Sequence, residues 1–221
     1  MLIKFVILYT MFFSFLISTL YINTNKRYYT IAKAVNSIGF ILVAAYGGVV
    51  LGNTAFYSML PALIFCLFGD VFLGIHTQCD TQVCFLAGIF SFTAAHIAYT
   101  FAFSNIAPLS IYDFIFPTLS IFIAYMLTKL ENMEIEKRLK KYTIIYSFFV
   151  SLLLSKSISI LFVSGITTEH ILIFLGSLMF FISDFIIFFL YFYKKKHHLV
   201  GTFNLLFYYY GMLFLALSLW Y

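Results

Sequence analysis

Charged residues are scarce in this chain of 221 residues. Asp, Glu, Lys and Arg make up 10% of it, against about 25% in an ordinary soluble domain. Hydrophobic residues make up 63%, and the mean hydropathy is +1.03. A soluble fold of this size cannot bury so much apolar surface, so we expect lipid to be the solvent for much of the chain. The net charge of +5 lies in short loops, which indicates membrane topology and not nucleic-acid binding.

Cysteine and the common catalytic motifs are also poorly represented. The three cysteines, Cys66, Cys79 and Cys84, do not suggest a disulfide framework, and one C-x4-C spacing is a weak metal signal. The chain has no G-x-S-x-G, H-E-x-x-H or P-loop sequence, so neither a serine nucleophile nor a cofactor is predicted. A zinc site built from a deep histidine and two deep aspartates is conceivable, but a second deep histidine is lacking. We predict no metal.

Eight apolar segments are each about as long as a membrane-crossing helix needs to be, roughly 20 residues. We therefore predict an all-α polytopic transmembrane bundle of about eight spans, forming one domain over residues 1–221. The spans are expected near residues 4–22, 30–50, 56–75, 83–104, 110–130, 141–162, 168–192 and 198–220.

Basic residues lie on alternate loops. Among the loops after the first, third, fifth and seventh spans, all but the third carry Lys or Arg, and the loops after the second, fourth and sixth carry none. Positive loops stay in the cytoplasm, so both termini are predicted to be extracytoplasmic. The pattern fits a bacterial plasma membrane or a eukaryotic endoplasmic reticulum. The loop cations are Lys26, Arg27, Lys137, Arg138, Lys140, Lys141, Lys194, Lys195 and Lys196.

The third and seventh spans contain similar short sequences, Phe-Gly-Asp-Val-Phe over residues 68–72 and Ile-Ser-Asp-Phe-Ile over residues 182–186. Four spans separate the two sequences, so both segments cross the membrane in the same direction. A parallel 4+4 repeat is one organisation that this pattern favours.

Polar residues inside the spans are the strongest functional signal. An ionisable side chain at the centre of a membrane helix costs about 2.5–3.5 kcal/mol on insertion scales, so such residues usually mark function or pairing. A rise of about 1.5 Å per residue places polar groups from five spans in one slab of the cytoplasmic half. These residues are Lys33, Asn36, Asp70, His96, Asp184, Asn204 and Tyr208.

Each of these residues also has a structural interpretation. The Lys33 amine can reach the membrane surface by extending its side chain. His96 can be a hydrogen-bonded core residue, and Tyr208 can be a packing residue in a chain with 17 tyrosines. Lys156 is expected in the outer half of the membrane, away from the others, and is interpreted as structural.

Two carboxylates in a low-dielectric site favour acid–base chemistry, because Asp70 or Asp184 can donate a proton while the other stays ionised. That pairing suits cleavage of an ether-like bond through an oxocarbenium ion. The alternative is a proton-coupled transporter or lipid carrier that uses the same cluster as a relay. Transporters often have broken spans near the midplane, whereas Pro61, Pro108 and Pro117 lie near the outer span ends.

Four stretches of the chain resemble the YhhN family of lysoplasmalogenase-like membrane proteins. They are residues 67–70 (Leu-Phe-Gly-Asp), 88–99, 176–184 and 208–211 (Tyr-Tyr-Tyr-Gly), and Lys33 resembles an early lysine of the family. The resemblance follows nearly the whole chain in order and spacing. It implies an eight-span hydrolase without a cofactor.

The resemblance also implies a reaction and a partner. The substrate would be lysoplasmalogen, a lysophospholipid with a vinyl-ether chain, and the products a fatty aldehyde and glycerophosphoethanolamine or glycerophosphocholine. By the same likeness Asp70 and Asp184 become the catalytic pair, supported by Lys33, His96 and Tyr208. Asn36 and Asn204 are added as supporting residues because they are expected at the same depth.

Overall fold

Eight α-helices make up most of the described chain. The computed structural model describes residues 2–22, 26–194 and 198–221, and within these residues the only β-type pairing is an isolated bridge between Met133 and Tyr193. The helices are α1 (Leu2–Tyr21), α2 (Lys26–Ala45), α3 (Ala55–Cys79), α4 (Gln82–Ser104), α5 (Ile115–Leu127), α6 (Lys137–Val163), α7 (Thr168–Phe192) and α8 (His198–Leu217). The predicted all-α transmembrane bundle is confirmed.

Seven of the helical segments in the described residues are long and apolar enough to cross a membrane. The remaining helix, α5, is shorter: with the 3-10 turn η2 (Ile111–Phe114) it covers residues 111–127. That is about 25 Å at about 1.5 Å per residue, slightly less than a hydrocarbon core of about 30 Å. Helix α5 ends at Leu127, three residues before the end of the span predicted over residues 110–130.

Two other helices extend beyond the predicted ends of their spans. Helix α3 continues to Cys79, beyond the predicted end at residue 75, and α6 begins at Lys137, before residue 141. Hydropathy detects contact with lipid, whereas hydrogen bonding allows a helix to continue into the polar interface. At the opposite end of the bundle, α2 finishes in a π-helical turn, η1 (Tyr46–Val50).

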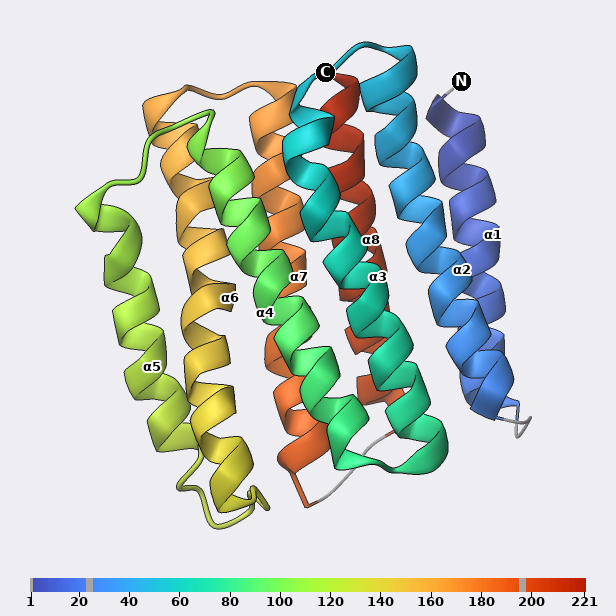
Figure 1. Ribbon diagram of the computed structural model, residues 1–221, viewed down its shortest axis with the longest axis vertical. Coiled ribbons are helices and arrows are strands. Elements are labelled where there is room, and N and C mark those ends of the chain that lie inside the picture. The colour runs from blue at the N-terminus through green and yellow to red at the C-terminus, as the bar shows by residue number, and fades with distance from the viewer. Residues whose placement is uncertain (1, 23–25, 195–197) are drawn as a thin grey trace.

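The helices run alternately up and down, and both termini lie at the same end of the bundle (Figure 1). The opposite end carries most of the cations and is termed the basic end. Whether the basic end faces the cytoplasm stays a prediction, and Lys195 and Lys196 lie outside the described residues. The described cations of the basic end are Lys26, Arg27, Lys129, Lys137, Arg138, Lys140, Lys141 and Lys194.

Helix contacts repeat between the two halves of the chain. Helix α3 packs closely on α4 as α7 does on α8, and α2 contacts α3 as α6 contacts α7. Between the halves, α4 contacts α6 and α8 contacts α2. Each of these contacts therefore has a counterpart between the equivalent helices of the other half. A parallel 4+4 repeat requires this correspondence.

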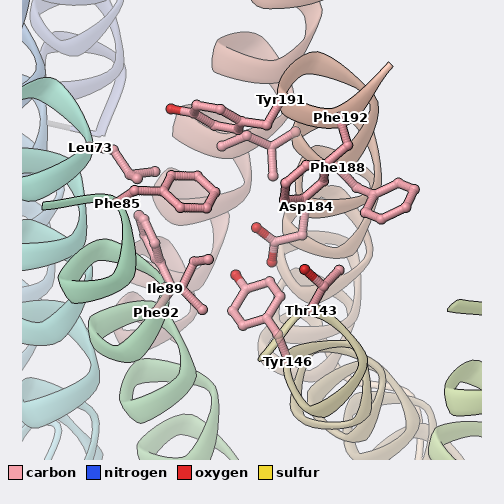
Figure 2. A pocket seen from close by; sticks show the side chains of 11 residues that line it. Leu73, Phe85, Ile89, Phe92, Thr143, Tyr146, Asp184, Phe188, Tyr191 and Phe192 are labelled. Atoms are coloured by element: carbon pink, nitrogen blue, oxygen red, sulfur yellow. The ribbon is translucent and has the colours of Figure 1, made fainter. Parts of the chain in front are cut away.

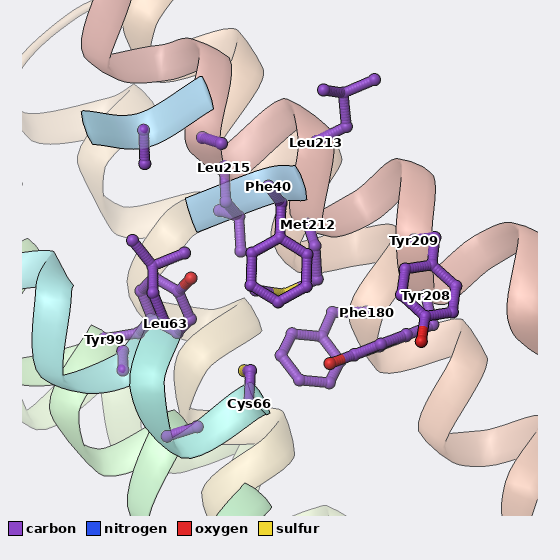
Figure 3. Packing of buried hydrophobic residues seen from close by; sticks show 14 of the residues in the cluster. Phe40, Leu63, Cys66, Tyr99, Phe180, Tyr208, Tyr209, Met212, Leu213 and Leu215 are labelled. Atoms are coloured by element: carbon purple, nitrogen blue, oxygen red, sulfur yellow. The ribbon is translucent and has the colours of Figure 1, made fainter. Parts of the chain in front are cut away.

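Small residues allow α7 and α8 to approach closely. A Cβ atom added to Gly176 would lie 2.8 Å from the carbonyl oxygen of Gly211, so a larger side chain would force the two helices apart. The core next to this contact is aromatic. The Phe180 ring of α7 packs against the Tyr208 ring of α8 at 5.3 Å between centroids, with Cys66 of α3 nearby (Figure 3). The α7–α8 contact thereby fixes the position of α7, which carries Asp184.

A buried ion pair lies far from the basic end. Lys156 of α6 is fully buried, and its amine donates to the carbonyl oxygen of Pro108 at 2.8 Å and to Asp113 at 3.3 Å. Asp113 also accepts from the backbone amide of Ser110 at 2.9 Å. These contacts tie α6 to the turn before α5, so the role of Lys156 is structural.

Candidate active site in the bundle

The first carboxylate cluster surrounds Asp70, which is fully buried on α3. Lys33 Nζ lies 3.0 Å from Asp70 Oδ1, and Asp70 Oδ2 accepts hydrogen bonds from Ser37 and from Tyr208, both at 2.6 Å. A carboxylate offers only acceptors, and here three donors surround it. Lys33 is 6% exposed, so its side chain points to Asp70 and not to the membrane surface.

The second cluster surrounds Asp184 on α7. His96 Nε2 lies 3.0 Å from Asp184 Oδ2 and 3.3 Å from the hydroxyl of Tyr146. Figure 2 shows the Tyr146 hydroxyl pointing toward the Asp184 carboxylate. The other ring nitrogen of His96 is buried and has no hydrogen-bond partner among the described residues. The imidazole therefore directs its polar contacts to Asp184 and Tyr146.

Aromatic rings separate the two clusters. The Phe180 ring lies 4.5 Å from the His96 ring and 5.3 Å from the Tyr208 ring, centroid to centroid. Phe92 lies against the same tyrosine at 5.7 Å. The sequence places these polar side chains in one slab, and the structure divides them into two groups joined through Phe180.

The two predicted asparagines lie outside both clusters. Asn36 donates to the backbone of Phe12 at 3.1 Å, so it links α2 to α1 and does not contact Asp70. The expectation that Asn36 contributes directly to the site has no support in these contacts. Asn204 donates to the carbonyl oxygen of Ser183 at 2.8 Å and to its hydroxyl at 2.9 Å. It therefore fixes the α7 backbone immediately before Asp184.

A small cavity of about 50 Å³ lies among α3, α4, α6 and α7 toward the basic end. Asp184 and the hydroxyls of Thr143 and Tyr146 supply polar groups to one side of it, facing apolar side chains of α3 and α4 (Figure 2). The other lining residues are Leu73, Phe85, Ile89, Phe92, Ile187, Phe188, Tyr191 and Phe192.

A larger cavity of about 410 Å³ lies among α5, α6 and α7, within the range of about 300–1,000 Å³ typical of ligand pockets. It shares four lining residues with the small cavity, and Asp184 is the only charged one. The shared residues are Thr143, Tyr146, Asp184 and Phe188.

The two aspartates therefore differ in access. The Asp184 side chain is 9% exposed and lines both cavities, whereas the Asp70 side chain is 1% exposed and lines neither. A group that reacts with a ligand must be reachable. On that ground Asp184 is the carboxylate positioned for direct contact, and Asp70 is enclosed by its own partners.

Three residues of the site were not identified from the sequence. Ser37 lies four residues after Lys33, a spacing that puts both on one helix face, and that spacing was the available signal. Tyr146 and Thr143 had no such signal, because the sequence contains many tyrosines and threonines in apolar surroundings. Among the described residues, no three His, Cys, Asp or Glu side chains gather in a metal-binding arrangement.

In a comparison with protein families, the model of the YhhN family matches residues 28–219. The chain belongs to the YhhN family. No curated protein and no solved structure matches it. The match extends over both carboxylate clusters and all the residues that line the two cavities of this YhhN protein.

The geometry gives this YhhN protein an acid–base pair at the edge of an apolar cavity. Asp184 and His96 are within hydrogen-bonding distance, so one can hold a proton that the other releases. The surrounding Phe and Tyr side chains limit water to what the small cavity admits. Proton transfer to a mostly apolar ligand is the chemistry that this arrangement suits.

Proposed function

We propose that this YhhN protein is an intramembrane hydrolase that cleaves the vinyl-ether bond of lysoplasmalogen. The products are a fatty aldehyde and glycerophosphoethanolamine or glycerophosphocholine. Membership of the family is consistent with a hydrolase, and one observation carries the reaction. Asp184, in contact with His96, lines both an apolar cavity wide enough for a ligand and a small cavity with hydroxyl groups.

The proposed mechanism begins with a proton from Asp184. The proton adds to the outer alkenyl carbon, the C=C electrons form that C–H bond, and the positive charge is shared with the ether oxygen as an oxocarbenium ion. Asp184, now ionised, accepts a proton from water as the water oxygen attacks the charged carbon. In the resulting hemiacetal, the hydroxyl group loses its proton and forms the aldehyde C=O bond as the bond to the glycerol oxygen breaks, and that proton passes to the glycerol oxygen, which leaves as the alcohol. One water is consumed and one aldehyde is formed.

Asp70 takes a supporting role in this mechanism. Its carboxylate holds the Tyr208 hydroxyl at 2.6 Å, and the Tyr208 ring packs against Phe92, which lines the small cavity. The Lys33–Asp70 ion pair thus lies one side chain behind the cavity wall and fixes that wall. Lys33 and Tyr208 both contact Asp70, so neither is proposed to bind the phosphate of the substrate.

The substrate would be a lysophospholipid of the cytoplasmic leaflet, because both cavities lie in the half of the bundle nearer the basic end. Positive loops predict that this end is cytoplasmic and that both termini are extracytoplasmic.

The test uses purified protein in liposomes with lysoplasmalogen and follows aldehyde release. A matched substrate control is the saturated alkyl-ether lysolipid, which has no C=C bond to protonate and should remain intact. Cleavage of both lipids, or proton flux across the liposome with no lipid turnover, would contradict the proposal. Proton flux without turnover would instead favour a transporter.

A further inference from the structure

Helix α5 leaves a gap beside α7. It packs against α6 and against the 3-10 turn η2 that precedes it. The larger cavity lies between α5 and α7, and residues of α6 line its third side. At the end away from the basic end, the rings of Phe116 and Phe181 meet at 5.6 Å and close the gap. Figure 1 shows α5 at the edge of the bundle, beside α6.

The same gap is open toward the surrounding lipid. Ile123 of α5 and Phe185 of α7 both line the cavity, yet they are 51% and 47% exposed. A cavity at membrane depth whose lining is exposed in this way faces hydrocarbon and not water. Its inner wall, by contrast, includes the Asp184 carboxylate.

We propose that the gap between α5 and α7 is a lateral entrance for a single-chain lipid. The aliphatic chain enters from the bilayer and lies on α6 between α5 and α7, with its polar end at Asp184. That the polar end is a vinyl ether rests on the proposed function. That a single aliphatic chain occupies the cavity rests on the lining of the cavity and on its opening to lipid.

The dimensions favour an aliphatic chain over a protein segment. The lining residues of α5 run from Phe116 to Leu127, about 16 Å along the axis at about 1.5 Å per residue. A helix is about 10 Å across with its side chains, and the rings of Phe116 and Phe181, which meet at 5.6 Å at one end of the cavity, leave no room for it to continue between α5 and α7. A thin, flexible, apolar occupant fits where a helix does not.

One position on α5 offers a direct way to fill the cavity. Ala124 lines it and is 8% exposed, so a phenylalanine at residue 124 would project into the chain site. Thr118 is on the same helix, exposed to lipid and outside the lining. Ala124→Phe and Thr118→Phe therefore form a matched pair. Val150→Phe, from α6, is a second filling variant in case Ala124→Phe fails to fold.

The experiment uses an alkyl-ether lysolipid with a diazirine in its chain, which can be photo-crosslinked but should not be hydrolysed. Protein in liposomes is irradiated, and crosslinked peptides are located by mass spectrometry. We expect crosslinks on the cavity-lining residues of α5, α6 and α7, reduced at least fivefold by Ala124→Phe or Val150→Phe and unchanged by Thr118→Phe.

Crosslinks that are spread evenly over all lipid-facing helices and are equal in all variants would contradict the proposal of a lateral entrance. The outcome is separate from that of the aldehyde assay because the lipid used is not cleaved. Specific crosslinks without aldehyde release would contradict the proposed hydrolase and support the entrance. Aldehyde release without specific crosslinks would support the proposed hydrolase and contradict the entrance.

Discussion

Asp70 and Asp184 occupy corresponding positions in the two halves of the bundle. Each lies on the third helix of its half, α3 or α7. Asp70 is contacted from α2, in its own half, and by Tyr208 from α8 in the other half. Asp184 is contacted from α6, in its own half, and by His96 from α4 in the other half. The repeat in helix packing therefore extends to the partners of the two carboxylates.

The two positions have diverged in chemistry within this common frame. Asp70 faces a lysine in a closed cluster, whereas Asp184 faces an imidazole beside two cavities. The same helix arrangement thus supplies one enclosed ion pair and one accessible acid–base pair, and the two should respond differently to substitution.

Replacement of Asp184 by Asn should abolish most of the activity. A carboxamide at this position could not supply the proton, and a general acid typically contributes about 10²–10⁴-fold to the rate. The measurement is the initial rate of aldehyde release. Asp80→Asn is the control, because Asp80 lies in a turn with φ of 50°, a conformation that Asn also tolerates. Equal rates for the two variants would contradict the role of Asp184.

The Lys33–Asp70 pair should behave as a unit in stability. Removal of one partner leaves a buried charge uncompensated, which typically costs about 3–5 kcal/mol. We expect Lys33→Met and Asp70→Asn each to lower the melting temperature in detergent, and the double variant to lose less than the sum of the two. Strict additivity would mean that the 3.0 Å contact carries no coupling.

Tyr146→Phe should slow the reaction and lower the stability by no more than about the 1 kcal/mol of one hydrogen bond. The change removes only the hydroxyl that contacts His96 at 3.3 Å, and the loss of one hydrogen bond of about 1 kcal/mol corresponds to roughly a fivefold decrease in kcat. Tyr142→Phe, one turn earlier on α6 with its ring against Phe90, is the matched control. A similar decrease in both variants would show that the effect is not local to Asp184.

The α7–α8 contact should not tolerate a side chain at Gly176. A Cβ there would lie 2.7 Å from Leu215 and 2.8 Å from a backbone oxygen, and overpacking of this kind costs about 1–3 kcal/mol. Gly176→Val should therefore lower the melting temperature by several degrees. Gly201→Val provides the comparison on α8, because the nearest atom to its Cβ lies at an ordinary 3.8 Å. An unaffected Gly176→Val protein would argue against the close packing.

Cysteine labelling can establish which side the basic end faces. Cys79, at the end of α3, is exposed, Cys84 is half-buried and Cys66 is buried. In a Cys84→Ser background, we expect a membrane-impermeant maleimide to react with Cys79 in inside-out vesicles and not in right-side-out vesicles. Adding Cys79→Ser gives the blank. Labelling only in right-side-out vesicles would reverse the predicted topology.

The sequence predicts which residues lie at similar heights along the helices, because every helical residue advances by nearly the same distance, about 1.5 Å. Counting from the span ends places Asp70 and Asp184 at similar depths, and the two clusters that contain them are linked through Phe180. Eight apolar runs likewise predict the helices, since length and hydropathy alone decide which segments can lie in lipid.

Rotation about the helix axis could not be predicted equally well. Each residue turns by about 100°, so neighbours on one helix face different partners. Asn36 points to α1 while Ser37, the next residue, reaches Asp70. The cavities were also beyond prediction, because they depend on how α5, α6 and α7 pack and on no single segment.

Two unlike cavities meet at one carboxylate, and this arrangement would keep the products of bond cleavage apart. A hydrolysis at Asp184 would leave an oily fragment on the side of α5 and a water-soluble fragment on the side of the basic end. The first would dissolve in the bilayer and the second in the aqueous phase. The two fragments would then be diluted into separate phases, so recombination would be rare and neither would have to pass the other on its way out.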